Sequence, residues 1–366
     1  MLTRMVSMLL EGIFAAVTTC FYPDGRPYWN KLEHNVDRYS RTRLGGMVLL
    51  GSTGEAVMLS DEESREALRV ARRAAAPDKV LIAGVGRESA IETIRLAEYA
   101  AQLEYDAALV RTPHYYRTQM QKREMLTYYQ AVADRSPIPV VLYSIPSCTA
   151  YELPLEVVAE LASHPNIAGM KDSSGKVERI AAIADAVRSA PRRTVQVTSI
   201  FQAVTARMTS ADSKGAGAEA GAPANFVSAG ELGVAGTAVA ATLPKPALKT
   251  RTREVGFQLL SGSAQTLHDS LDAGAVGGIL ALAAFAPQAA CEVYTAWKDG
   301  DPPLAREKQG RIRQAGLEIC AQMGIPGVKH ALDVNGYYGG RARLPLLPLT
   351  AERQGRVEAL LGDIRN

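Results

Sequence analysis

The chain has 366 residues, of which 47% are hydrophobic and 22% are charged, and its formal net charge is +3. This composition is typical of a globular protein, and the small charge and the lack of a bilayer-length apolar stretch argue against nucleic acid or membrane partners. The four cysteines and five histidines show no metal-ligand spacing and the N-terminus shows no signal-peptide pattern, so we expect a cytoplasmic protein without a metal ion.

Short apolar runs alternate with amphipathic helical patterns at a period of about thirty residues, which is typical of βαβ units. The runs are continuous, as expected for strands buried on both faces of a parallel sheet. Eight such units predict an α/β fold of the TIM (β/α)8 barrel type over 10–298. An open doubly wound sheet is the alternative, but no glycine-rich dinucleotide fingerprint follows the first strand. The predicted strands are Ile13–Thr18, Gly46–Gly51, Val80–Val85, Ala107–Arg111, Val140–Ser144, Ile167–Lys171, Gly256–Ser261 and Val276–Leu282.

Residues 195–254 interrupt this pattern, because they are rich in Ala, Gly, Ser and Thr and have no apolar period. We expect a long low-complexity insertion that is largely disordered, or else a segment that is absent from the mature protein. Two similar segments flank it, Thr194–Val197 and Gly256–Leu259, and either could begin the seventh strand. We favour the second, because it runs into a small-residue turn and then a helix. Residues 299–366 predict a C-terminal helical extension packed on the barrel.

Lys171 ends the predicted sixth strand, after the apolar run Ile167-Ala-Gly-Met170. In a TIM barrel the functional groups lie at the C-terminal ends of the strands. A lysine buried there favours its neutral amine, which can attack a carbonyl and form a Schiff base. The ordinary alternative is a lysine in a solvated loop, since most lysines lie on the surface.

Other strand ends carry residues suited to a ligand. Gly51-Ser-Thr-Gly-Glu55 follows the second strand, where backbone N–H groups and hydroxyls could hold a carboxylate, although such residues are also common in turns. Tyr143 ends the fifth strand, where a phenol can relay protons. Small residues after the seventh strand (Gly262 and Ser263) and in the eighth (Gly278) would allow close approach of a ligand. These residues converge on one barrel mouth.

Five motifs carry a resemblance to a known family: Gly51-Ser-Thr-Gly-Glu55, Thr112-Pro-His-Tyr-Tyr116, Leu142-Tyr-Ser-Ile-Pro146, Gly169-Met-Lys-Asp-Ser173 and Gly274-Ala-Val-Gly-Gly278. Through them the chain resembles the dihydrodipicolinate synthase and N-acetylneuraminate lyase superfamily of class I, Schiff-base aldolases. The resemblance covers about 10–190 and 256–347. It implies a lyase that acts on a 2-oxo acid without a cofactor.

The resemblance also implies a role for each site residue. Lys171 would form an imine with the ketone of pyruvate or another 2-oxo acid, and Tyr143 would shuttle protons. Ser52 would link Tyr143 to a second tyrosine, Tyr115, which reaches in from a neighbouring subunit, so we expect a homodimer or homotetramer. The backbone around Ser52 and Thr53 would bind the 2-oxo acid carboxylate, with Gly262, Ser263 and Gly278 as further substrate-binding candidates.

The substrate within the family is predicted from a few positions. In the lysine-biosynthetic synthases an arginine two residues after the fifth-strand proline binds the second substrate, and here that position is Cys148. Several stretches, among them 164–173, 324–329 and 336–340, resemble 4-hydroxy-2-oxoglutarate aldolase of the animal type. We therefore expect cleavage of 4-hydroxy-2-oxoglutarate to pyruvate and glyoxylate. The alternatives are 4-hydroxy-tetrahydrodipicolinate synthase, a sugar-acid aldolase or dehydratase, and a non-catalytic 2-oxo acid binder whose mouth the insertion blocks.

Overall fold

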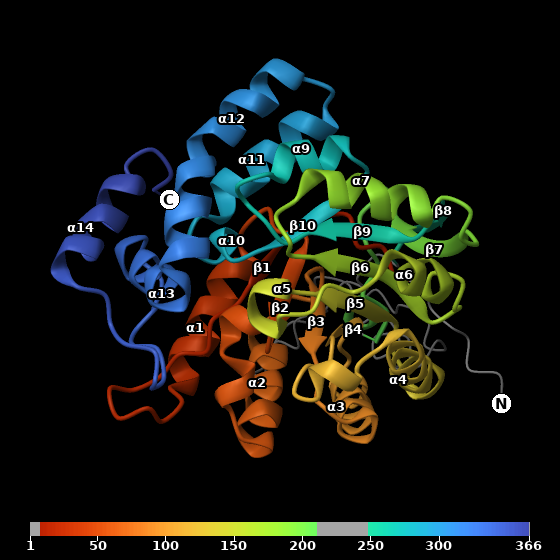
Figure 1. The fold of residues 1–366 in the computed structure, drawn as a ribbon. Coiled ribbons are helices and arrows are strands. Elements are labelled where there is room, and N and C mark those ends of the chain that lie inside the picture. Colours follow the sequence, from red (N-terminus) through yellow and green to blue (C-terminus); the bar gives the residue numbers. More distant parts are fainter. Residues whose placement is uncertain (1–7, 211–247, 366) are drawn as a thin grey trace, which may run out of the picture.

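The computed structural model describes residues 8–210 and 248–365. In it, eight parallel strands close into a barrel in the order β1-β10-β9-β6-β5-β4-β3-β2 (Figure 1). This confirms the predicted TIM barrel and excludes the open sheet. The barrel strands are β1 (Gly12–Ala16), β2 (Gly46–Leu49), β3 (Val80–Gly84), β4 (Ala107–Arg111), β5 (Val140–Ser144), β6 (Ile167–Asp172), β9 (Gln258–Ser261) and β10 (Gly277–Leu280).

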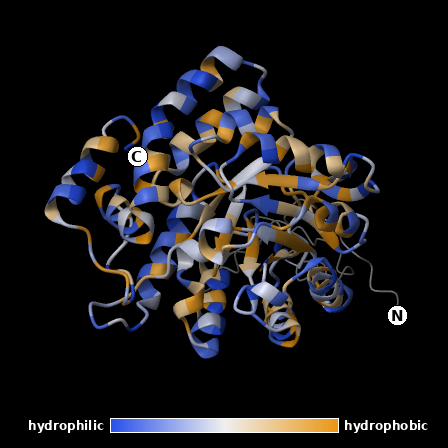
Figure 2. Cartoon of the chain, viewed as in Figure 1, coloured by the Kyte–Doolittle hydropathy of each residue, from blue (hydrophilic) through white to orange (hydrophobic). Residues whose placement is uncertain are grey.

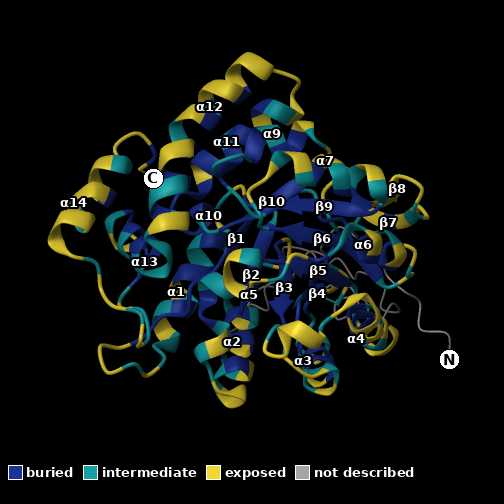
Figure 3. Cartoon of the chain, in the orientation of Figure 1, coloured by how far each residue is buried: buried dark blue, intermediate teal, exposed yellow. Residues whose placement is uncertain are grey.

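Helices surround the barrel and cover its outer face (Figure 1). The helix α2 begins directly after Ser60, which forms a reciprocal capping box with Glu63. Exposed residues gather on the outward sides of the helices, which are striped with polar and apolar positions (Figures 2 and 3). The helices around the barrel are α1 (Trp29–Ser40), α2 (Asp61–Ala74), α3 (Ala90–Gln102), α4 (Lys122–Arg135), α5 (Pro146–Thr149), α6 (Leu155–Leu161), α7 (Val177–Ala186), α9 (Leu267–Asp272), α10 (Leu282–Phe285) and α11 (Pro287–Lys298).

The barrel strands are buried on both faces, which explains their continuous apolar sequences. Alternate residues of each strand point to opposite sides. One set, including Ile82, Leu109 and Val141, fills the barrel interior. The other set, including Leu81 and Leu142, packs in the layer between the strands and the helices. Neither face of a strand therefore needs polar residues, except at the mouth.

The seventh barrel strand begins at the second of the two similar segments, as predicted. Gln258–Ser261 is β9, which pairs in parallel with β6 on one side and β10 on the other. The first segment, Thr194–Val197, lies outside the barrel. It belongs to β7 (Arg193–Thr198), which pairs antiparallel with β8 (Thr250–Val255) in a separate two-stranded sheet. The expected disorder of 195–254 is therefore wrong at both described ends of that segment, and 211–247 lie outside the described residues.

The described ends of the inserted segment lie at the N-terminal end of the barrel, opposite the mouth. Val195 and Val197 of β7 form a small apolar cluster with Leu9, which directly precedes β1. Beyond β7, the buried Arg207 lies 3.5 Å from Asp106, just before β4. Asp106 also accepts hydrogen bonds from the N–H groups of Leu81 and Ala206. These contacts tie the described ends of the segment to the strand starts.

The C-terminal extension consists of helices, as predicted. Its first helix lies beside α9 and α11, and its later helices lie on the side of the barrel near α1 (Figure 1). It comprises α12 (Pro302–Ala315), a π-helical turn (Gly316–Gln322), α13 (Gly324–Val334) and α14 (Ala351–Leu360). Across the described ranges, no helix is long and apolar enough to cross a membrane.

Candidate functional site

Lys171 lies inside the barrel mouth rather than in a solvated loop. It is 5% exposed, and its Nζ lies 4.2 Å from the centroid of the Tyr143 ring. The two residues are direct partners in the parallel pairing of β5 with β6. The next residue, Asp172, is also buried, but it pairs with Arg179 of α7 at 2.8 Å. This alternation turns Lys171 to the barrel interior and Asp172 to the helix layer.

Lys171 differs from the other buried lysines of the described ranges, because no residue in those ranges is a polar partner for it. Buried lysines in the described parts of the chain are Lys79, Lys171 and Lys329. Lys79 donates to the carbonyls of Thr42 and Leu44, and Lys329 donates to the Arg341 carbonyl and pairs with a carboxylate. Lys171 makes no hydrogen bond or ion pair within those ranges. Among these lysines, Lys171 is therefore the one whose amine no oxygen acceptor of the described residues holds, and its place beside Tyr143 suits attack on a carbonyl.

Tyr143 and Ser52 meet across the mouth. The Tyr143 side chain is 3% exposed, and its hydroxyl lies 3.3 Å from the Ser52 Oγ. Ser52 opens a short 3-10 helix, Ser52–Gly54, directly after β2. The N–H groups at the start of such a helix have no acceptor within it. The structure brings Lys171, Tyr143 and Ser52 together, and the role of the Ser52 and Thr53 backbone in binding a carboxylate stays a prediction.

The loop that carries Ser52 is fixed by the C-terminal extension. Glu55 adopts a left-handed backbone conformation at φ 55° and is almost completely buried. Its carboxylate lies 2.6 Å from the Lys329 Nζ of α13 and accepts a hydrogen bond from the Arg343 N–H. Burial lowers the pKa of Lys329, while Glu55 opposes that shift. A buried pair with both partners present holds its groups in one arrangement, so the extension positions the Ser52 loop.

The small residues after the seventh strand lie at the mouth, but the one in the eighth strand does not. A Cβ on Gly262 would lie 1.9 Å from the Ser173 Oγ, so the turn can approach the end of β6 only because it has no side chain. Ser263 follows in the same turn and its N–H donates to the Ser261 Oγ. Gly278 is buried within β10, and a Cβ there would point at Leu267 and Leu280 of the helix layer. The structure therefore places Gly278 away from the predicted substrate site.

Tyr115 is not brought to the other site residues within this chain. It is 77% exposed, its ring packs edge-on against Tyr116, and its N–H donates to Glu88. No hydrogen bond joins it to Ser52 or Tyr143 in the described parts of the chain. Its predicted role in a neighbouring subunit stays a prediction.

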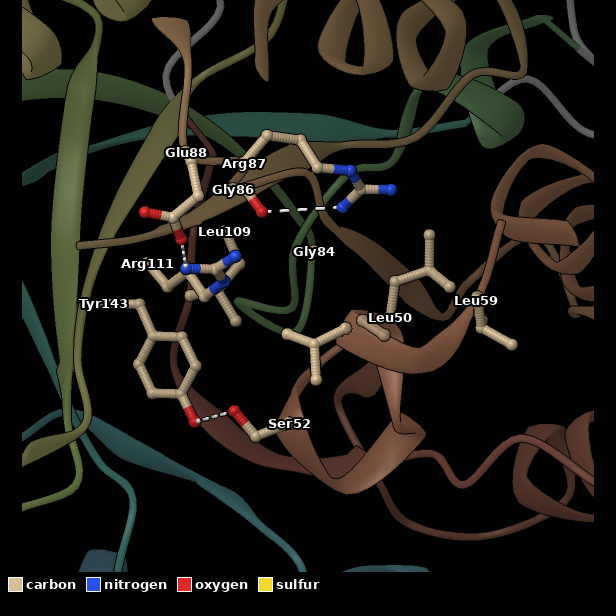
Figure 4. A pocket seen from close by; sticks show the side chains of 13 residues that line it. Leu50, Ser52, Leu59, Gly84, Gly86, Arg87, Glu88, Leu109, Arg111 and Tyr143 are labelled. Carbon is tan, nitrogen blue, oxygen red and sulfur yellow. Dashed lines mark hydrogen bonds and ion pairs between the residues drawn. The ribbon is translucent and has the colours of Figure 1, made fainter. Parts of the chain in front are cut away.

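The structure adds charged residues at the mouth that sequence reasoning did not select. A cavity of about 210 Å³ beside Tyr143 and Ser52 is lined by Arg87, Glu88 and Arg111, among others (Figure 4). Arg111 donates to the Glu88 carboxylate at 2.8 Å. Arg111 could have been selected from the sequence, because it is a charged residue that directly follows the apolar run 107–110. Among the described residues, no group of three or more His, Cys, Asp or Glu could hold a metal ion.

Comparisons with known proteins agree with this geometry. The sequence model of the Dihydrodipicolinate synthetase family matches 9–227 and 241–364. The 4-hydroxy-tetrahydrodipicolinate synthase of Methanothrix thermoacetophila is 27% identical over 364 residues, which is 98% of this chain and 100% of that protein. The enzyme of the same name from Xanthomonas campestris pv. campestris is 39% identical over 176 residues, which is 48% of this chain and 58% of that protein.

A solved structure gives the same result. Chloride-inhibited dihydrodipicolinate synthase from Acinetobacter baumannii, crystallised with pyruvate, has a TM-score of 0.75 and 25% identity, covering 97% of this chain and 99% of that chain. The predicted closer resemblance to 4-hydroxy-2-oxoglutarate aldolase is not supported, because the similar curated proteins are named as synthases. The chain therefore belongs to the dihydrodipicolinate synthetase family and is a carbon–carbon lyase of the Schiff-base type.

Proposed function

We propose that Lys171 forms a Schiff base with a 2-oxo acid and that the protein makes or breaks a carbon–carbon bond to a pyruvate unit held on this lysine. The observation that carries the proposal is a buried lysine that has no polar partner among the described residues and lies 4.2 Å from the ring of a tyrosine that itself contacts Ser52. A lysine in this state can act as a nucleophile toward a carbonyl, and the tyrosine beside it can move protons.

In the cleavage direction, the Lys171 amine attacks the C2 carbonyl of a 4-hydroxy-2-oxo acid. The Tyr143 phenol gives its proton to the departing hydroxyl, so that water leaves, an iminium ion forms and Tyr143 becomes a phenolate. Tyr143 takes the proton from the C4 hydroxyl as the C3–C4 bond breaks. The electron pair of that bond passes to the iminium, which becomes an enamine, and an aldehyde leaves. Protonation of the enamine at C3 and addition of water release pyruvate and restore the amine. Ser52 holds the Tyr143 hydroxyl in position throughout.

Two specific reactions fit this scheme, and a different observation supports each. The names of the similar curated proteins favour the 4-hydroxy-tetrahydrodipicolinate synthase reaction. The exposed Cys148, where the resemblance leads one to expect an arginine in the synthases, favours cleavage of 4-hydroxy-2-oxoglutarate. We place the synthase reaction first for testing, because the relatives support it more broadly than one position opposes it.

The described ends of the inserted segment give no support to the non-catalytic alternative. It rested on an insertion that blocks the mouth, whereas the described ends of that segment contact Leu9 and Asp106 at the opposite end of the barrel. The parallel pairing of β9 with β6 and β10 is also intact. A protein that only bound 2-oxo acids would have no need of an unpartnered lysine beside a tyrosine.

Borohydride trapping with pyruvate tests the proposal. We expect a reduced pyruvate adduct on Lys171, found by intact mass and peptide mapping. The same preparation is then assayed for formation of 4-hydroxy-tetrahydrodipicolinate and for release of pyruvate from 4-hydroxy-2-oxoglutarate, and the faster reaction identifies the substrate. A folded protein that gives no adduct, or an adduct on a different lysine, would refute the Schiff-base assignment.

We further propose that Tyr115 completes the site of a neighbouring subunit, since its side chain is exposed in the single chain. Mixed assemblies of two variants test this role, because each variant keeps the side chain that the other has lost. We expect Lys171→Ala and Tyr115→Phe preparations, each weakly active or inactive alone, to gain activity when they are dissociated and reassembled together. In such a mixed assembly one site has both an intact Lys171 and an intact Tyr115 from its partner. Mixed assemblies, verified by mass, that gain no activity would exclude the role in trans.

A further inference from the structure

The end of β4 places a guanidinium in the mouth beside Tyr143. Ala107 and Leu109 of this strand lie in the barrel interior, and alternation puts the Arg111 side chain on the same side. Arg111 lines the cavity that Ser52 and Tyr143 also line (Figure 4). Gly86 makes room for it, because a Cβ on that residue would lie 2.8 Å from the Arg111 Cγ. The arginine is thus built into the mouth.

Arg111, Tyr143 and Lys171 form one row across three adjacent strands. Arg111 is the direct partner of Tyr143 in the β4–β5 pairing, and Tyr143 is the direct partner of Lys171 in the β5–β6 pairing. Neighbouring strands are about 4.8 Å apart, so the backbone of Arg111 is roughly 10 Å from that of Lys171. A substrate whose C2 is bound to Lys171 and whose C4 hydroxyl faces Tyr143 extends along this row toward Arg111.

The Arg111 guanidinium has N–H donors that its contacts with the described residues do not use. Its contacts with Glu88, His114 and the Thr112 carbonyl all use Nη1. Within the described ranges, Nη2 and Nε make no hydrogen bond. Both oxygens of Glu88 are already engaged. One accepts from the Arg111 Nη1, and the other accepts from the N–H groups of His114 and Tyr115.

The charge of the cavity favours an anion. Two guanidiniums, those of Arg87 and Arg111, line it against the single carboxylate of Glu88. Burial is the largest influence on that carboxylate and raises its pKa, but the hydrogen bonds from the Tyr115 N–H, from Arg111 and from the His114 N–H lower the pKa overall. Glu88 therefore stays ionised and holds Arg111 in place, and the lining keeps an excess of positive charge.

We propose that Arg111 binds the carboxylate at the far end of the substrate and so selects 2-oxo acids that end in a second carboxylate. This inference rests on the Schiff base at Lys171. The carboxylate would accept hydrogen bonds from the free Nη2 and Nε, an arrangement that suits the planar guanidinium. In the lysine-biosynthetic synthases the resemblance implies an arginine two residues after the fifth-strand proline, where this chain has Cys148. Arg111 would supply a positive charge at the mouth from the fourth strand instead.

Trapping with uncleavable 2-oxo acids tests this without relying on turnover. 2-Oxoglutarate and 2-oxopentanoate lack the C4 hydroxyl, and they differ only in a terminal carboxylate against a methyl group. We measure the concentration of each that gives half-maximal borohydride adduct on Lys171, with pyruvate as the short reference. The wild-type protein is expected to trap 2-oxoglutarate at a lower concentration than 2-oxopentanoate.

The variants then assign the preference to one side chain. In Arg111→Leu the half-maximal concentration of 2-oxoglutarate should rise about 10- to 100-fold, the usual effect of losing a hydrogen bond to a charged group, with pyruvate and 2-oxopentanoate unchanged. Arg111→Lys should recover part of the preference. The matched control is Arg135→Leu, which removes an exposed arginine at the end of α4 and should change nothing.

Each other outcome has a distinct meaning. If wild-type protein traps no 2-oxo acid, the proposed function fails and this inference fails with it. If pyruvate is trapped but Arg111→Leu keeps the preference for 2-oxoglutarate, only the role of Arg111 is refuted. If the variant loses adduct formation with all three acids alike, Arg111 supports the fold of the mouth and does not select the substrate.

Discussion

Replacing Lys171 with alanine is expected to abolish turnover and the pyruvate adduct, because covalent catalysis through the amine has no substitute in the mouth. In the described parts of the chain, the other buried lysines are engaged: Lys79 with backbone carbonyls and Lys329 with Glu55. The variant should fold normally, since the lost amine has no hydrogen-bond partner that would be left unsatisfied. The measurements are steady-state kinetics, borohydride trapping and thermal unfolding.

Lys176→Ala is the matched control for this prediction. It removes a lysine five positions along the same segment, whose side chain is 66% exposed and lies 3.6 Å from Glu152. An exposed ion pair of this kind contributes little to stability, about 0–1 kcal/mol, so activity and unfolding should both stay unchanged. Near-normal activity in Lys171→Ala would end the proposed mechanism, and equal loss in both variants would point to damage in the loop rather than to the amine.

The barrel could be predicted from the sequence because each of its strands carries a local signal. Runs such as 80–84 and 140–142 are apolar throughout, since the interior and the helix layer bury opposite faces of the same strand. Lys171 and Tyr143 could be predicted as site residues because they are polar residues at the ends of such runs. In each case the information lies within a few neighbouring residues.

The β7–β8 sheet could not be predicted in this way. Residues 194–197 pair with residues 251–254, which lie 54 to 60 positions further along the chain, beyond an Ala- and Gly-rich stretch. Such a pairing depends on contacts at long sequence separation, and composition within 195–254 indicated disorder instead. The location of this sheet, against Leu9 below the barrel, follows from the same distant contacts.

The direction in which a strand residue points, toward the barrel interior or the helix layer, also could not be predicted from the sequence. Gly278 was expected at the mouth because two adjacent glycines allow close approach, but the strand runs on to Leu280 and alternation turns Gly278 to the helix layer. Arg111 was named only as the end of a strand, because its inward direction depends on the β4–β5 register. A shift of one residue would reverse either conclusion, and sequence periodicity cannot specify that shift where every position is apolar.

Tyr143→Phe is expected to lower kcat about 10²- to 10⁴-fold, the usual effect of removing one general acid–base group. The change removes only the hydroxyl that contacts Ser52, and the ring over which the Lys171 Nζ lies remains. Lys171 should therefore still form a reducible adduct with pyruvate, which separates proton transfer from imine chemistry. The measurements are kcat with the identified substrate and the yield of adduct at saturating pyruvate.

A tyrosine in the helix layer supplies the control. Tyr105 is also buried, and its hydroxyl donates to the Leu68 carbonyl at 2.9 Å, away from the mouth. Tyr105→Phe should lower the free energy of unfolding by about 1 kcal/mol, the net value of one hydrogen bond, and should leave kcat unchanged. A similarly small change of kcat in Tyr143→Phe would remove its phenol from the reaction.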